Sequence, residues 1–170
     1  MVIQDIIRLF ADGAVIPIVL IAGYVLLFKI PPGYKYEAYA RILMAGLTSY
    51  LVAKLLGSIW QPSGERPFEI LGVAPGASYL NNPGFPSDHA LFTAFLTFAV
   101  WFETRQKKLS ILLAVLTLLV CVGRVLALVH TPLDVIGGLV VASVGALWYL
   151  QIGKQRSVAE SRSKSKDIVQ

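Results

Sequence analysis

Cysteine and histidine are scarce in this chain, which has one cysteine and two histidines among its 170 residues. A single cysteine excludes a disulfide framework and a thiolate metal cluster within one chain. Cys121 lies in an apolar run, and we interpret it as a residue of the packed core. His89 and His130 each lie in a short polar cluster at the edge of a long apolar segment. Ionisable groups are costly to hold in such a setting, which favours a reactive site.

Charged residues are also few, at 15%, whereas 56% of the residues are hydrophobic. This composition is too apolar for one soluble domain and predicts that lipid surrounds most of the chain. The net charge is +5, yet lysine and arginine fall in short links and in the tail rather than along one face, which argues against nucleic-acid binding. The N-terminus lacks the basic region and the small-residue cleavage site of a signal peptide, so we expect it to be retained.

Apolar segments long enough to cross a bilayer, about 17 to 25 residues, recur along the chain. The sequence predicts an all-α integral membrane protein, a bundle of about five transmembrane helices. Residues 2–10 add apolar side chains at helical spacing, typical of a short amphipathic helix that lies at the membrane interface. We expect one membrane-embedded domain over residues 1–153 and a disordered, basic, cytoplasmic tail over residues 154–170. The predicted spans are residues 14–30, 37–60, 86–103, 109–129 and 132–152.

Basic residues gather in the links that five spans place on one side of the membrane. They are Lys29 and Lys35 in the first link, and Arg105, Lys107 and Lys108 in the third. Together with the basic tail, they assign this side to the cytoplasm. The polar connection over residues 61–85, which is long for a helix-to-helix link, and both histidine clusters then lie on the extracytoplasmic face.

The first cluster, Pro86-Ser87-Asp88-His89, has the composition of a helix start. Free N–H groups and the helix dipole make such a terminus a site for anions, and a phosphate suits it. A purely structural interpretation is that Ser87 and Asp88 cap the helix and that His89 forms a local hydrogen bond. This segment alone leaves both interpretations open.

The second cluster has Arg124, five intervening residues, His130, three further residues and Asp134. A carboxylate four residues after the histidine can accept an imidazole N–H and fix its tautomer. The other ring nitrogen is then a nucleophile, and an arginine beside it can clamp phosphoryl oxygens. The alternative is a buried ion pair between Arg124 and Asp134, with His130 as a bystander.

Arg66-Pro67, then Pro86-Ser87-Asp88-His89, then Arg124 with His130 and Asp134 resemble, in this order, the three signature motifs of the type 2 phosphatidic acid phosphatase superfamily. The resemblance covers about residues 54–138. The third motif, which continues into Val135-Ile136-Gly137-Gly138, is its most specific part. Asp88 stands where many members have glycine, and Gly84-Phe85-Pro86-Ser87-Asp88-His89-Ala90 is most similar to the bacterial undecaprenyl-pyrophosphate phosphatases.

The resemblance implies a role for each matching position. It implies that His130 is a nucleophile that forms a phosphohistidine, that Asp134 is its partner, and that His89 protonates the leaving oxygen. It further implies that Arg66, Ser87 and Arg124 bind phosphate, and that neither a metal nor another cofactor takes part. The nucleophile, its orienting carboxylate and the arginine clamp agree with the interpretation of the residues themselves.

One position departs from the pattern of the family. Its first motif has a lysine separated by six residues from the Arg-Pro pair, but that position here is Ile59. The nearest upstream lysine is Lys54, about 9 Å below the expected helix end near Trp60, and its long side chain can recover much of this gap. Either Lys54 binds phosphate or it anchors at the interface or pairs within the bundle. Asp88 would repel a phosphate unless its carboxylate turns toward the helix amides.

These observations predict a phosphatase of the bacterial inner membrane that removes the terminal phosphate of a lipid pyrophosphate, namely undecaprenyl pyrophosphate, at the extracytoplasmic face. A first alternative is another lipid phosphate, such as phosphatidylglycerophosphate, phosphatidic acid or lipid A. A second is a non-catalytic protein that binds or transports phospholipid. The expected partners are the substrate and membrane lipids, and the sequence does not specify an oligomeric state.

Overall fold

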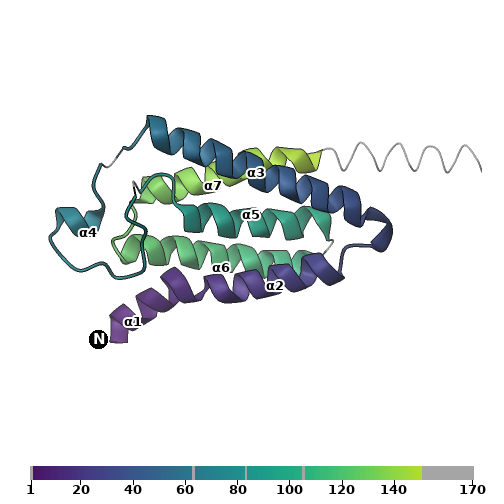
Figure 1. Cartoon of the computed structure of the whole chain (residues 1–170). Helices are drawn as coiled ribbons and strands as arrows, with labels where there is room; N and C mark the ends of the chain where they lie inside the picture. The colour runs from purple at the N-terminus through teal and green to yellow at the C-terminus, as the bar shows by residue number, and fades with distance from the viewer. Residues whose placement is uncertain (1, 63, 83, 105, 151–170) are drawn as a thin grey trace, which may run out of the picture.

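The computed structural model describes residues 2–62, 64–82, 84–104 and 106–150. This part of the chain is helical, with no strand (Figure 1). The helices that build the bundle are α2 (Val15–Phe28), α3 (Lys35–Ile59), α5 (Asp88–Glu103), α6 (Lys107–Leu126) and α7 (Pro132–Ala146). The shorter elements are α1 (Val2–Arg8), the π-helical turn η1 (Leu9–Gly13), the 3-10 turn η2 (Pro32–Tyr34), α4 (Pro67–Ile70) and the 3-10 turn η3 (Leu147–Leu150). The predicted domain end at residue 153 and the tail lie outside the described residues.

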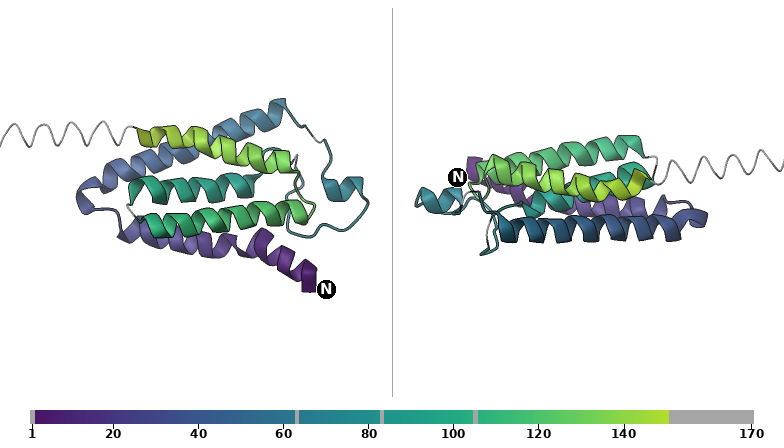
Figure 2. Two further views of the ribbon diagram at one scale, coloured as in Figure 1. Left: turned by 180° about the vertical axis from the view of Figure 1, so that it is seen from behind. Right: turned by 90° about the horizontal axis from the view of Figure 1, so that it is seen from above.

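Helix α5 is the central element of the bundle, in contact with α2, α3, α6 and α7 (Figures 1 and 2). Its buried positions carry mainly small residues, including Ala90, Ala94 and Ala99. Small side chains let the backbones of neighbouring helices approach closely, which is the usual packing of helices in lipid. A helix surrounded in this way has apolar residues on every face, and the sequence of α5 meets that requirement.

Four stretches are long and apolar enough to cross a membrane: Val2–Phe28, Pro32–Ile59, Lys107–Leu126 and Pro132–Leu150. Most of the residues in their apolar segments are not buried within the protein, as expected where lipid covers the outside of a bundle. The prediction of a helical protein with several membrane spans is therefore confirmed. The remaining predicted span, over residues 86–103, corresponds to α5, whose 16 residues reach about 24 Å at 1.5 Å per residue.

The N-terminal segment differs from the short separate helix expected over residues 2–10. Helix α1 continues through the π-helical turn η1 toward α2, and the whole stretch from Val2 to Phe28 has the length and composition of one span. Figure 1 shows α1 bent away from the bundle at this turn. No residue of α1 is buried, so a position of α1 at the membrane interface stays a prediction.

The direction of the helices brings both histidine clusters to one end of the bundle. Helices α3 and α6 end there, α5 and α7 begin there, and the connection over residues 61–85 with its short helix α4 lies beside them (Figure 1). Close packing of α5 on α7 depends on Gly138, because a Cβ at this position would lie 2.6 Å from the carbonyl oxygen of Ser87. The first turns of the two helices are thereby held against each other.

The opposite end of the bundle is held by a buried ion pair between α3 and α5. The Nε of Arg41 donates to one carboxylate oxygen of Glu103 at 2.7 Å, and Nη2 donates to the other at 2.9 Å. The side chain of Glu103 is 4% exposed. Two parallel bonds of this kind fix orientation as well as distance.

Candidate active site

His130 lies in the short corner between α6 and α7, beside the N-terminus of α7. Thr131 is the N-cap of that helix, and its backbone N–H donates to Oδ2 of Asp134 at 2.7 Å, while Thr131 Oγ1 accepts from the amide of Asp134 at 3.2 Å. This capping box fixes the carboxylate. Its Oδ2 lies 3.6 Å from Nδ1 of His130, an ion-pair distance that is longer than a hydrogen bond. The carboxylate therefore faces Nδ1, and it makes no contact with the other ring nitrogen, Nε2.

The surroundings of His130 favour its neutral form. Burial lowers the pKa of His130 below its ordinary value, the nearby carboxylate of Asp134 opposes this shift, and the positive charges of Arg124 and Arg66 lower the pKa further. The residue is only 4% exposed. A neutral imidazole has a free electron pair on one nitrogen, which is the form that a nucleophile needs.

Arg124 is buried in the last turn of α6, where it is 1% exposed. Its Nη1 donates to Oδ1 of Asp12, from η1, at 2.8 Å. Its Nε has no hydrogen-bond partner within the described part of the chain. The alternative of a buried pair between Arg124 and Asp134 is therefore wrong, because the carboxylate that pairs with Arg124 is Asp12.

Ser87 occupies the N-cap position of α5 without capping the helix through its side chain. Its backbone N–H donates to the carbonyl oxygen of Asp134 at 2.9 Å, and its buried Oγ has no partner among the described residues. The structural interpretation of Ser87 as a side-chain cap is therefore wrong. His89 follows in the first turn of α5 and lies within electrostatic range of Arg124, Asp12 and His130. The two predicted motifs thus meet at one end of the bundle.

Arg66 is 7% exposed and binds backbone carbonyls from two separate segments. Its Nη1 donates to the carbonyl of Val129, beside His130, and its Nη2 donates to the carbonyls of Leu80 and Asn82 at 3.1 Å each. Burial lowers the pKa of Arg66, which Glu69 and Asp134 oppose, and a guanidinium remains charged at any physiological pH. Arg66 therefore ties the long connection to the histidine corner and brings a positive charge to it.

Gly84 lies where three of these side chains converge. A Cβ on Gly84 would stand 3.5 Å from Oδ2 of Asp134, 3.7 Å from Nη1 of Arg66 and 3.7 Å from Nδ1 of His130. The absence of a side chain lets the backbone of the connection approach the His130–Asp134 pair. Sequence reasoning used Gly84 only as part of a motif and gave it no role of its own.

Lys54 lies at the edge of this region rather than among the buried groups. Its Nζ is 3.8 Å from Oδ1 of Asp88, and both side chains are about half exposed, at 49% and 46%. The carboxylate of Asp88 therefore pairs with Lys54. Together with Gln61 and Asn82 the two residues line a recess of about 270 Å³ beside the start of α5.

Unpaired buried polar atoms are concentrated in the motif residues. Six buried side-chain atoms in the described part of the chain have no hydrogen-bond partner, and four of them belong to Ser87, Arg124, His130 and Asp134. Buried polar groups in native proteins are normally paired, so an unpaired cluster indicates groups that bind a further molecule. The hydroxyl of Ser87 and the guanidinium N–H of Arg124 are suited to the oxygens of a phosphate ester, whereas the unpaired atom of His130 is Nδ1, which faces Asp134.

Asp12 and Ser78 are contacts of this site that the sequence analysis missed. Asp12 falls between the expected N-terminal helix and the first predicted span, outside every motif. An isolated carboxylate in an apolar run is the signal that indicates it, because such a group is costly without a partner. Ser78 gives no comparable signal, since serine in a polar connection is ordinary.

Comparison with known proteins agrees with the geometry. The sequence matches the PAP2 superfamily over residues 38–157. It is also 40% identical over 113 residues to the Escherichia coli (strain K12) protein named "Putative undecaprenyl-diphosphatase YbjG", an alignment that covers 63% of this chain and 52% of that protein. The chain thus spans about half the length of this curated relative. No solved structure matches the chain. The family match covers more than half of the sequence and includes all three motifs, so the chain belongs to the PAP2 superfamily.

Proposed function

We propose that this protein is a membrane phosphatase that hydrolyses the terminal phosphate of a lipid pyrophosphate through a phosphohistidine intermediate. The observation that carries the proposal is the buried His130, neutral and faced at Nδ1 by a fixed carboxylate, among unpaired groups of Arg124 and Ser87. The name of the Escherichia coli relative, an undecaprenyl-diphosphatase, favours undecaprenyl pyrophosphate as the lipid.

In the first step Nε2 of His130 attacks the terminal phosphorus. A nitrogen–phosphorus bond forms, the bond from phosphorus to the bridging oxygen breaks, and protonated His89 gives its proton to that oxygen. The lipid leaves as its monophosphate. The imidazole of His130 now carries a positive charge with its proton on Nδ1, and the carboxylate of Asp134 offsets this charge.

In the second step water attacks the phosphohistidine. His89 accepts a proton from the water, the nitrogen–phosphorus bond breaks, and inorganic phosphate leaves with His130 neutral again. Both steps pass through a transition state with charge on the phosphoryl oxygens. Arg124, Ser87, the amides at the start of α5 and the positive charge of Arg66 are the groups that bind these oxygens.

Lys54 and Asp88 have a separate role in this scheme. Their ion pair lines the recess beside the start of α5, outside the buried groups around His130. A pyrophosphate has a second phosphate that a monophosphate lacks, and we assign Lys54 to that second phosphate. In this role Lys54 leaves Asp88 and pairs with the substrate. Breaking this ion pair costs free energy, and only a strongly charged head group offsets that loss.

The membrane placement completes the proposal. Helix α5 crosses the bacterial inner membrane together with the four other long helices, α1 lies at the interface, and the site opens on the extracytoplasmic side, opposite the basic links. This orientation follows the asymmetry of lysine and arginine between the two ends of the bundle.

The test uses the full chain purified in detergent and measures phosphate released from undecaprenyl pyrophosphate. Wild type should release phosphate, and His130→Ala should release none while it keeps the thermal unfolding profile of the wild type. Rapid acid quench with substrate labelled on the terminal phosphate should trap a phosphorylated protein that is absent from His130→Ala. Full activity of His130→Ala would refute the covalent mechanism.

A panel of substrates separates the remaining candidates. Faster release from phosphatidylglycerophosphate, phosphatidic acid or lipid A would replace the lipid and keep the chemistry. Binding of undecaprenyl pyrophosphate without release would indicate a non-catalytic lipid-binding or transport protein. In the panel, Lys54→Met should slow hydrolysis of the pyrophosphate more than that of the monophosphates.

A further inference from the structure

The π-helical turn η1 packs directly on the helix that carries Arg124. A Cβ on Gly123 would lie 2.6 Å from the backbone nitrogen of Ala11, so the two backbones touch at this point. The next residue on each side is a charged one, Asp12 from η1 and Arg124 from α6. The contact between backbones therefore places a carboxylate beside the arginine of the third motif.

The carboxylate of Asp12 is bonded at both oxygens. Oδ1 accepts from Nη1 of Arg124 at 2.8 Å and from the hydroxyl of Ser78 at 2.9 Å, and Oδ2 accepts from the backbone N–H of Ser78 at 2.9 Å. The side chain of Asp12 is 24% exposed, whereas that of Arg124 is 1% exposed. One carboxylate thus joins the N-terminal segment, α6 and the long connection.

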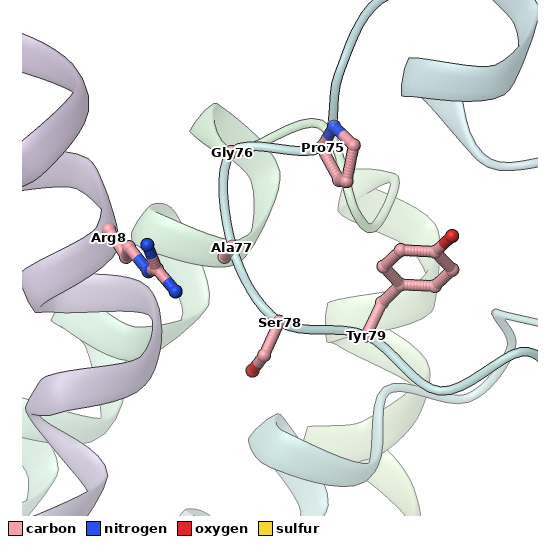
Figure 3. A pocket seen from close by; sticks show the side chains of 6 residues that line it. All are labelled: Arg8, Pro75, Gly76, Ala77, Ser78 and Tyr79. Atoms are coloured by element: carbon pink, nitrogen blue, oxygen red, sulfur yellow. The ribbon is translucent and has the colours of Figure 1, made fainter. Parts of the chain in front are cut away.

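Figure 3 shows the third of these partners, where the segment Pro75–Tyr79 passes beside the helix that carries Arg8. The connection is fastened close by at a second point, because the N–H of Gly76 donates to the carbonyl of Ala127 at 3.0 Å. Ser78 is therefore set in a segment that is held against α6. Its two bonds fix the carboxylate of Asp12 in turn.

We propose that Asp12 is a positioning residue of the phosphatase site, which acts by fixing the guanidinium of Arg124. This inference rests on the proposed function. A guanidinium is planar, so a bond that holds Nη1 also fixes the directions of the remaining N–H groups. The unpaired Nε of Arg124 is then aimed before substrate arrives. Asp12 lies outside residues 38–157, the region that matches the family, so the match assigns it no role.

The form of η1 is consistent with this role. A π-helical turn is rare and is frequently found at functional sites, because the extra residue in the turn changes the direction in which the following side chains point. Here that turn is Leu9–Gly13, and it contains Asp12. The carboxylate of Asp12 also competes with phosphate for Arg124 and therefore weakens substrate binding. Its contribution is expected in kcat rather than in substrate affinity.

The experiment compares Asp12→Asn with Asp5→Asn, a matched change at an exposed position of α1. Asparagine keeps the shape of the side chain but loses the charge and one of the two acceptor oxygens. We expect kcat for Asp12→Asn to fall about 100-fold, because a small displacement of a phosphate-binding group has effects of this order. KM should stay the same or fall, since a negative charge near the substrate is removed. Asp5→Asn should match the wild type.

Three further measurements exclude a merely structural effect. Each kcat is expressed per site that can be trapped as a phosphorylated protein, so that unfolded protein does not contribute. In an Arg124→Lys background the Asp12→Asn change should have little additional effect, because both act through one group. Asp12→Glu, which restores the charge, should recover part of the activity.

The outcomes are distinct. Wild-type kcat per trapped site in Asp12→Asn, or the same fold-loss with and without Arg124, would overturn the positioning role while the proposed function stands. A loss that appears in KM alone would also overturn it. A wild-type chain that hydrolyses none of the lipid phosphates would overturn the proposed function, and this role with it.

Discussion

Asp134 has two tasks in the structure, and a pair of substitutions separates them. Its Oδ2 accepts the N–H of Thr131 at the start of α7, and the same oxygen lies 3.6 Å from Nδ1 of His130. In Asp134→Asn an amide nitrogen at this shared position points a donor toward Nδ1 and leaves the N–H of Thr131 without its acceptor. This stabilises the tautomer with its proton on Nε2, which has no electron pair for attack on phosphorus.

The expected loss can be estimated for each task. A wrong tautomer of a catalytic histidine costs on the order of 10⁴-fold in kcat, equivalent to about 5.4 kcal/mol of transition-state free energy. The weakened cap costs only about 0.5 to 2 kcal/mol of folding stability. Thr131→Ala is the control, since it removes the hydroxyl that accepts from the amide of Asp134 and leaves the carboxylate near His130.

The assay measures phosphate release at saturating lipid and thermal unfolding in the same detergent. Asp134→Asn and Thr131→Ala should unfold at similar temperatures, and only Asp134→Asn should lose about four orders of magnitude in kcat. If both variants retain activity within a few-fold of wild type, the carboxylate does not set the tautomer of His130, and the reasoning fails.

Three more outcomes follow from the geometry. Because burial lowers the pKa of His130, the folded protein binds fewer protons than the unfolded chain below pH 6.5, so the free energy of unfolding should fall as pH drops below that value, and the acid limb of kcat/KM should lie there too. A pH–rate profile with its acid limb above 6.5 would contradict this assignment. Glu103→Gln removes one charge of the buried pair at the opposite end of the bundle and should lower the free energy of unfolding by about 3 to 5 kcal/mol, with kcat per trapped site unchanged. Equal thermal stability of variant and wild type would show that the pair is not important. Gly138→Ala forces α7 away from the carbonyl of Ser87 and should cost about 1 to 3 kcal/mol together with activity, whereas Gly23→Ala, which meets no atom within 4 Å, should cost neither. Similar activity and unfolding temperature in the two glycine variants would exclude close packing as the reason for Gly138.

The long helices could be predicted from the sequence because their cause is local. An apolar run of sufficient length must form a helix in lipid, where every backbone polar group needs an internal partner. The predicted ends agree with α3 and α5 to within about two residues, the usual precision for helix ends. The bend at η1 could not be predicted, because it depends on a contact between the backbones of Ala11 and Gly123, far apart in the sequence.

The site was predictable where a motif carries its own geometry. Asp134 is the fourth residue after His130, and the capping box at the start of α7 makes that spacing sufficient to bring the two side chains together. The partners of Arg124 and Lys54 depend instead on how helices pack. Asp12 and Asp88 approach them from other elements, and no spacing within the sequence encodes those pairs.

Arg66 binds mainly the main chain of its neighbours, so most of their side chains, apart from those of Asn82 and Tyr79, can vary. Three of the four oxygens it binds are the carbonyls of Val129, Leu80 and Asn82, which every amino acid supplies, and the fourth is Oδ1 of Asn82 at 3.1 Å. Leu80 is itself 66% exposed. The segment around it can therefore exchange its outward residues, and with them the surface that a lipid head group would meet in the proposed function, without loosening the backbone contacts beside His130. Substrate preference can in this way change while the chemistry stays constant.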